Sequence, residues 1–230
     1  MIWLRKQIAE GAHEYFNMKE VLLIMQPREI PEAISSFKAL DISKVWFRAF
    51  TEEEAVERMN SYVERSDFDY YYIGCDDCVA DQEALDSIRT WMDGDVPIAT
   101  GWCLVSQEKD LVNLTRNPVV YSNGIYARVE DYDFLSIGEI RGMPHVFDTY
   151  FAGFALTAIR RDIWMRYPLK VNEHTRQQTD VEFSNRVLGA GVPIMAVRNA
   201  CVHHLKQQHD VSLKLNWIVG EREPEVEEEL

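Results

Sequence analysis

Two adjacent aspartates, Asp76 and Asp77, directly follow the run "YYYIGC" and are the residues in this chain whose type and position first suggest chemistry. Hard divalent cations take oxygen ligands and often share them with substrate phosphates. A bound cation would also relieve the repulsion between two neighbouring carboxylates. Two other interpretations stay open. The pair could form a solvated acidic turn, and Cys75 with Cys78 spells the CxxC of a zinc site.

The zinc interpretation needs two further ligands. The candidates are Cys201, His203 and His204, which lie about 125 residues further along the chain, whereas structural zinc sites usually place the second pair nearby. Packing at the end of a strand explains both sulfur atoms as small apolar groups. The residue types therefore favour Mn²⁺ or Mg²⁺ over zinc.

An alternation of strand and helix patterns must position the acidic pair. Short apolar runs alternate with segments whose apolar residues recur at helical spacing. Such a rhythm predicts a parallel, right-handed, doubly wound sheet, in which ligands bind beyond the carboxyl ends of the strands. The predicted strands cover 21–25, 44–50, 69–74 and 96–105, and the helices between them begin near Pro31, Thr51 and Asp81.

The second half of the chain is less regular. Segment 106–148 contains the pair Asn123-Gly124 and predicts a hairpin or a loop insertion. We find no internal repeat and no linker, so one domain is expected over 1–220. The remaining predictions are a strand and a short helix capped by Asp162 in 149–168, a helix in 179–191, a strand or strand pair in 192–206, and an acidic tail at 221–230.

Composition excludes several classes of function. The chain has 230 residues, of which 47% are hydrophobic, and a formal net charge of −14. This charge argues against a nucleic-acid partner, because phosphates would be repelled over most of the surface. No run of about 18 apolar residues predicts a transmembrane helix. The scattered cysteines and the absence of a secretory signal pattern predict a cytoplasmic protein.

The order of these motifs resembles a glycosyltransferase of the GT-A fold, similar to family 2 enzymes and their small viral or archaeal relatives. The resemblance covers roughly residues 20–206. It rests on "YYYIGCDDCVADQEAL", "FAGFALTAIRRDIWMRYP" and "QTDVEFSNRVLGAGVPIMAVRNACVHHL". It implies an α/β fold with a Rossmann-like, mostly parallel central sheet flanked by helices and a smaller mixed sheet on the acceptor side. The nucleotide-binding half would span about 20–105 and the acceptor half about 106–206.

The resemblance assigns metal ligands. It implies that Asp77 is the main carboxylate on the metal and that Asp76 contacts the ribose or nucleotide. A histidine at the end of the last strand would complete the coordination, either His204, which we prefer, or His203. The family pattern has an acid where this chain has Cys75, so the metal affinity here would either be lower or rest on Asp77 alone.

The resemblance also assigns a general base. Asp180 lies where inverting enzymes place the carboxylate that takes the proton from the acceptor hydroxyl. Thr179 stands where these enzymes usually have a glutamate. The residue types alone equally allow Asp180 to be a helix N-cap or a first-turn acid.

Further binding residues follow from the resemblance. The end of the first strand would contact the nucleotide, and a glycine in a strand would let the backbone approach the sugar closely. A tryptophan on the short helix either stacks on a sugar ring or belongs to the core. The candidates are Pro27, Arg28 and Arg48 for the nucleotide, and Gly153, Phe154 and Trp164 for the acceptor or sugar.

The expected function is therefore a metal-dependent transfer of a sugar from a nucleoside-diphosphate sugar to a hydroxyl acceptor, with inversion. The acceptor could be a glycan, a protein or a small molecule, and a homo-oligomer is left open. One rival is a nucleotidyltransferase of related fold, although "MQPREIPEA" lacks its glycine-rich phosphate loop. The other is a non-catalytic binding module, suggested by Cys75 and Thr179 at positions where the family has acids.

Overall fold

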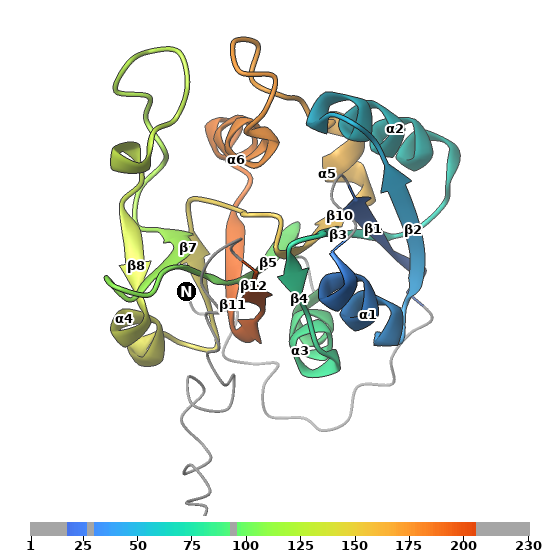
Figure 1. Cartoon of the computed structure of the whole chain (residues 1–230), viewed down its shortest axis with the longest axis horizontal. Coiled ribbons are helices and arrows are strands. Elements are labelled where there is room, and N and C mark those ends of the chain that lie inside the picture. The colour runs from blue at the N-terminus through green and yellow to red at the C-terminus, as the bar shows by residue number, and fades with distance from the viewer. Residues whose placement is uncertain (1–17, 27–29, 93–95, 206–230) are drawn as a thin grey trace, which may run out of the picture.

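A seven-stranded sheet in the order β2-β1-β3-β10-β5-β11-β9 forms the centre of the computed structural model, which describes residues 18–26, 30–92 and 96–205 (Figure 1). Five of its strands point the same way, and β9 and β10 run in the opposite direction. The strands are β1 (Glu20–Gln26), β2 (Ser43–Arg48), β3 (Tyr70–Cys75), β5 (Ile98–Trp102), β9 (Val146–Thr149), β10 (Leu156–Arg160) and β11 (Ile194–Cys201).

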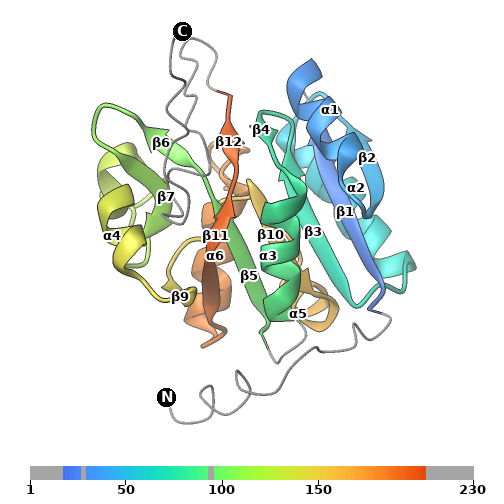
Figure 2. The same ribbon diagram turned by 90° about the horizontal axis from the view of Figure 1, so that it is seen from below.

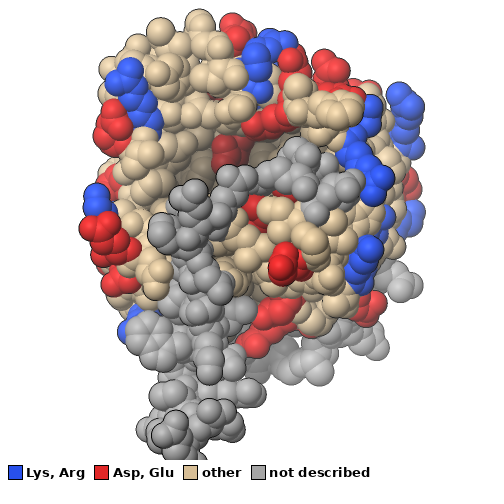
Figure 3. All heavy atoms as spheres, viewed as in Figure 1, with Lys and Arg blue, Asp and Glu red and all other residues tan. Residues whose placement is uncertain are grey.

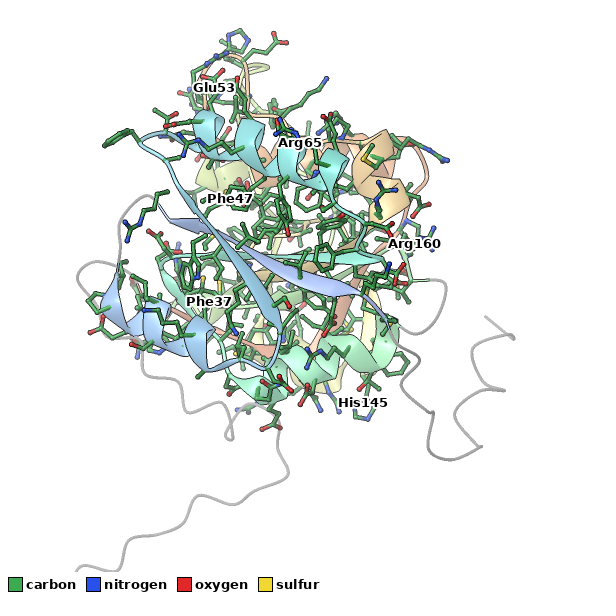
Figure 4. The ribbon with its side chains drawn as sticks, turned by 90° about the vertical axis from the view of Figure 1, so that its right-hand side faces the viewer. Phe37, Phe47, Glu53, Arg65, His145 and Arg160 are labelled. Atoms are coloured by element: carbon green, nitrogen blue, oxygen red, sulfur yellow. The ribbon has the colours of Figure 1, made fainter. Side chains whose placement is uncertain are left out.

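Helices cover both faces of this sheet. Successive strand residues point to opposite faces, so Leu22 and Ile24 pack with one set of helices and Val21 and Leu23 with the other. Figure 2 shows α1 and α3 in front of the sheet and α2, α5 and α6 behind it, and Figure 4 shows Phe37 and Phe47 on opposite sides. The helices are α1 (Pro31–Ala39), α2 (Glu52–Arg65), α3 (Gln82–Met92), α5 (Arg161–Arg166) and α6 (Thr179–Gly189).

Two smaller sheets complete the architecture. A two-stranded sheet joins β4 (Cys78–Val79) to β12 (His203–His204), and a three-stranded sheet is packed with α4 (Ile137–Gly142). Its strands are β6 (Leu104–Ser106), β7 (Leu111–Thr115) and β8 (Phe134–Ser136). The α/β fold expected from the sequence is thus confirmed.

The predicted helix starts are confirmed by their hydrogen bonds. Pro31 is the first residue of α1. The Thr51 hydroxyl accepts the Glu54 N–H at 3.1 Å, and the Asp81 carboxylate accepts the Ala84 N–H at 2.8 Å. Such side-chain caps satisfy backbone donors that have no partner within the helix. Among the described helices, none has the length and apolar character needed to cross a membrane.

The strand predicted over 96–105 is two strands. The chain leaves the central sheet at Cys103, and β6 then joins the smaller sheet in a hairpin with β7. The turn at Asn123-Gly124 forms, with Gly124 at a φ of 70°, but no strands flank it. The segment around this turn is therefore a loop insertion, and the hairpin lies earlier in the chain.

Strand β10 was not expected between β3 and β5. It is antiparallel to both, so its last residue, Arg160, pairs with Tyr70 at the start of β3. The pair Arg160-Arg161 and α5, which carries Trp164, therefore lie at the end of the sheet opposite Asp76 and Asp77. This corrects the expectation that Trp164 contacts the acceptor or sugar. Asp162 is not the cap of α5, because the helix begins at Arg161.

Candidate functional site

A cavity of about 460 Å³ opens where β1 and β3 end. Figure 3 shows this face hollowed, with acidic side chains visible inside the hollow. Residues from the β3–β4 turn, the first turn of α2, the start of α6 and β12 meet around it. Those that carry charge or can titrate are Glu52, Cys75, Asp76, Asp77, Cys78, Cys103, Tyr132, Asp180 and His204.

The two aspartates form the tight turn between β3 and β4. The Asp76 N–H donates to the Met25 carbonyl at 3.1 Å, which ties the turn to the end of β1. Asp76 is only 1% exposed, and the Asp77 side chain is 15% exposed, and both line the cavity. Asp76 and Asp77 are therefore too buried for the solvated acidic turn that the sequence left open.

The last strand brings His204 to Asp77. In the β4–β12 pair His204 lies opposite Cys78, and its Nε2 is 3.1 Å from Oδ2 of Asp77. The Leu205 N–H also donates to the Asp77 carbonyl at 2.6 Å. Since neighbouring strand residues point to opposite sides, His203 faces away and is not part of the cavity lining. The geometry thus pairs His204, rather than His203, with Asp77.

Neighbouring groups shift the pKa values of His204 and of Cys103, which lies beside it. Burial lowers the pKa of His204, but Asp77 and Cys103 outweigh burial and raise it to about 10. Interaction with the Cys78 thiol lowers the pKa of Cys103 to about 6, against burial and with help from His204. With this raised pKa, His204 is positively charged at neutral pH when no metal is bound. The place between Asp77 and Cys103 therefore accommodates a positive charge.

The donor set suits a divalent cation that is shared with a ligand. Within 18–26, 30–92 and 96–205, no three His, Cys, Asp or Glu side chains are close enough to hold a metal ion by themselves. Asp77 and His204 supply one carboxylate and one imidazole. A cation such as Mn²⁺ or Mg²⁺ commonly completes its shell with phosphate oxygens and water, so these residues fit that arrangement. Within those segments Cys75 and Cys78 therefore have no further ligands close enough to complete a zinc site.

Asp180 lies in the first turn of α6, on the cavity wall. The residue before the helix is Gln178, at a φ of 63° and without a side-chain cap, so Asp180 is a first-turn acid and not the N-cap. Burial and then the charge of Glu52 raise the pKa of Asp180 to about 7. A carboxyl that titrates near neutrality can both take up and release a proton under ordinary conditions.

Glu52 was not anticipated from the sequence. It is the first residue of α2, lines the cavity, and its Oε1 accepts the Thr179 N–H at 2.9 Å. In the sequence it is one of three consecutive acids, Glu52 to Glu54, which are typical of any helix start because the helix dipole favours them. No spacing or composition signal distinguishes it from its neighbours.

An aromatic and amide wall closes another side of the cavity. Tyr132 stacks on Phe134 with ring centroids 4.9 Å apart, and Phe151 meets Tyr132 edge-on at 5.6 Å. All three rings line the cavity together with Asn113. Asn113, Tyr132 and Phe134 come from the irregular segment 106–148, and Phe151 comes from the segment 149–168, where a strand was expected.

Gly153 and Phe154, the other candidates for the acceptor or sugar, line the cavity. A Cβ at Gly153 would lie 2.5 Å from Nδ2 of Asn113, so only glycine fits there without displacing the amide. Phe154 is buried and packs against Phe183 at 6.0 Å, and so forms the floor of the cavity.

Two other candidate residues, Trp164 and Arg48, do not line the cavity. Trp164 is 1% exposed, donates from Nε1 to Asn60 at 2.9 Å and packs edge-on against Tyr71, so it is a core residue and cannot stack on a sugar. Arg48 is exposed at the end of β2 and is not part of the cavity lining. Pro27 and Arg28 lie outside the described residues.

Comparison with known proteins supports the fold. No protein-family model and no curated protein sequence matches the chain. The crystal structure of A197 from STIV matches with a TM-score of 0.55 and 13% identity over 86% of this chain and 98% of that one. The structure of GalNAc-T7 with UDP, GalNAc and Mn²⁺ matches with a TM-score of 0.56 and 9% identity over 82% of this chain and 44% of that one. The chain therefore has a GT-A-like α/β fold.

Proposed function

We propose that this protein is a metal-dependent glycosyltransferase that moves a sugar from a nucleoside-diphosphate sugar to a hydroxyl acceptor with inversion. One observation carries the proposal. The Asp77–His204 pair and the Asp180 carboxylate line the same cavity, so a pair suited to a cation and a carboxylate suited to accept a proton would both face a molecule that binds there. The GT-A-like fold and the chemistry of these side chains support it.

On the donor side, Asp77 and His204 are the residues that would hold the divalent cation. When bound, such a cation supplies positive charge to the diphosphate that leaves the sugar. Asp76 is buried in the β3–β4 turn beside the end of β1, where its carboxylate would accept hydrogen bonds from ribose hydroxyls. The likeness to GalNAc-T7, whose structure contains UDP and Mn²⁺, agrees with a nucleoside diphosphate and Mn²⁺ as the ligands to test first.

On the acceptor side, Asp180 takes the proton of the attacking hydroxyl. The acceptor oxygen then bonds to the anomeric carbon, and the bond from that carbon to the diphosphate oxygen breaks with its electron pair leaving on the nucleoside diphosphate. The hydroxyl attacks the face of the anomeric carbon opposite the departing diphosphate, so the configuration of that carbon inverts. General-base catalysis is most effective when the pKa of the base is near the working pH, and Asp180 meets this condition.

The test is metal-dependent release of a nucleoside diphosphate. Purified protein is incubated with Mn²⁺, a panel of UDP- and GDP-sugars and a mixture of glycan, peptide and small hydroxyl acceptors. We expect turnover that EDTA abolishes and that Asp77→Asn reduces by two orders of magnitude or more, about 3 kcal/mol of transition-state stabilisation. Asp148→Asn, at an exposed position on β9, is the matched control and should keep full activity.

Other outcomes contradict the proposal. Release of inorganic diphosphate from a nucleoside triphosphate and a sugar phosphate would identify a nucleotidyltransferase instead. Binding of nucleotide sugars with no turnover over the whole panel would favour a non-catalytic module. For an active protein, NMR of the product's anomeric proton decides between inversion and retention.

A further inference from the structure

The Glu52 side chain connects the predicted nucleotide-binding half of the chain to the predicted acceptor half. It opens α2, in the half expected to bind the nucleotide, and its Oε1 accepts the Thr179 N–H at 2.9 Å at the start of α6, in the acceptor half. The neighbouring Glu53 forms an ion pair with Arg176, in the loop that leads into α6. The first turn of α2 thus holds the start of α6 through two contacts.

Helix α6 depends on this contact because it has no cap of its own. Its N-cap residue, Gln178, is in a left-handed conformation, and its amide is hydrogen-bonded to the backbone of Ala127 instead. The first N–H groups of a helix lack partners within the helix. Glu52 supplies an acceptor for one of them, in the same turn that carries Asp180.

Glu52 also places charge beside Asp180. The titratable groups that act on Asp180 are Glu52 from α2, Cys75 from β3, Cys103 from the β5–β6 junction, and Tyr132 from the segment after the 3₁₀ helix η1 (Val129–Asp131). Among these side chains, Glu52 has the largest effect on Asp180. A neighbouring negative charge disfavours the ionised form of a carboxyl and so makes it a stronger base.

A second observation places Glu52 in the same acidic cluster as the candidate metal site. Glu52, Asp76, Asp77 and Asp180 all line the same cavity. These four carboxylates therefore lie around the same space. Glu52 reaches this cluster from α2, a different element from those that carry the three aspartates.

We propose that Glu52 is the positioning residue for Asp180, fixing the first turn of α6 through Thr179 and holding a second negative charge beside the Asp180 carboxylate, so that Asp180 draws the acceptor proton more strongly. This role rests on the proposed function. The Glu52 carboxylate is bonded to the backbone of Thr179, the residue that directly precedes Asp180.

The first test is independent of catalysis. The Asp180 carboxyl is titrated by ¹³C NMR in the metal-free protein, with its signal assigned by its loss in Asp180→Asn. Glu52→Gln keeps an oxygen that can accept the Thr179 N–H but removes the charge, so we expect the Asp180 midpoint to fall by about one pH unit. Glu57→Gln removes one charge from an exposed position of α2 and should leave the midpoint unchanged. An unchanged midpoint in Glu52→Gln would overturn the proposal.

The second test uses the active enzyme. In a plot of kcat against pH, the acidic limb of Glu52→Gln should shift to lower pH by the same amount as the NMR midpoint. The KM for the donor should stay unchanged. Glu52→Ala, which also removes the hydrogen-bond acceptor, should lower kcat further. A kcat limb that stays in place while the midpoint moves would refute the positioning role. If the wild-type protein transfers no sugar, the proposed function fails, and the NMR titration still decides whether Glu52 acts on Asp180.

Discussion

Nε2 of His204 lies 3.1 Å from Oδ2 of Asp77, although 127 positions separate the two residues in the chain. The contact exists because β12 pairs with β4, the short strand that follows the aspartate turn. This pairing brings the end of the last described strand back to the end of β3. Through this pairing Asp77 and His204, which are far apart in the sequence, line the same cavity.

Replacing the two histidines separately should distinguish their roles. His204→Ala removes the imidazole beside Asp77, and we expect it to weaken Mn²⁺ binding by about 10-fold or more, a loss of roughly 1.4 kcal/mol or greater. His203→Ala, the adjacent residue on the opposite side of β12, should bind Mn²⁺ like the wild type. Isothermal titration with Mn²⁺ measures both. Equal losses in the two variants would show that the effect comes from the strand and not from the ligand.

Asp180→Asn should stabilise the protein at neutral pH. Folded Asp180 keeps its proton up to a pH of about 7, whereas the unfolded chain releases it near the ordinary aspartate pKa, so the folded state binds more protons between these values. The stability that Asp180 contributes is therefore fully present below about pH 4 and is lost as the pH rises to about 7.

Asp180→Asn replaces the carboxyl with an amide that does not titrate, so the loss of stability between about pH 4 and pH 7 disappears. The difference in unfolding free energy between Asp180→Asn and wild type should grow from near zero at pH 4 to at most about 4 kcal/mol at pH 8. Chemical denaturation in EDTA across this range measures it. A difference that does not change with pH would mean that the Asp180 carboxyl titrates normally. Because Asp180 is also the proposed base, the same variant should lower kcat about 10²–10⁴-fold.

Gly153→Ala should damage both stability and turnover. The added Cβ would lie 2.5 Å from Nδ2 of Asn113, whose Oδ1 accepts the Cys103 N–H, so the change strains a buried hydrogen bond at the cavity. We expect a loss of about 1–3 kcal/mol, as for other overpacked sites. Gly138→Ala, in α4 with its nearest neighbour at 3.9 Å, is the control and should be neutral or slightly stabilising. Thermal unfolding compares the two variants.

Trp164 variants should affect stability alone. Trp164→Ala empties a site that is 1% exposed and removes the hydrogen bond to Asn60, and we expect a cost of about 3–5 kcal/mol. The milder Trp164→Phe keeps most of the packing and should leave kcat and the KM for donor and acceptor unchanged. A raised acceptor KM in Trp164→Phe would return this residue to a sugar-binding role.

Local features of this protein could be predicted because they depend on neighbours in the sequence. The alternation of strands and helices, the first residue of α1 and the caps at Thr51 and Asp81 follow from periodicity and from the chemistry of helix starts. The placement of Asp76 and Asp77 at a strand end follows from the same patterns, since the run before them is apolar and the segment after them is a capped helix.

The tertiary structure alone decided which distant residues meet. β10 lies antiparallel between β3 and β5, an arrangement that no local pattern encodes, and it moves Arg160 away from the cavity. The selection of His204 over His203 depends on the register of a two-residue strand, because a shift by one residue would reverse the two side chains. Glu52 was missed for the same reason: its role comes from the packing of α2 against the start of α6, which depends on the whole fold and not on any spacing in the sequence.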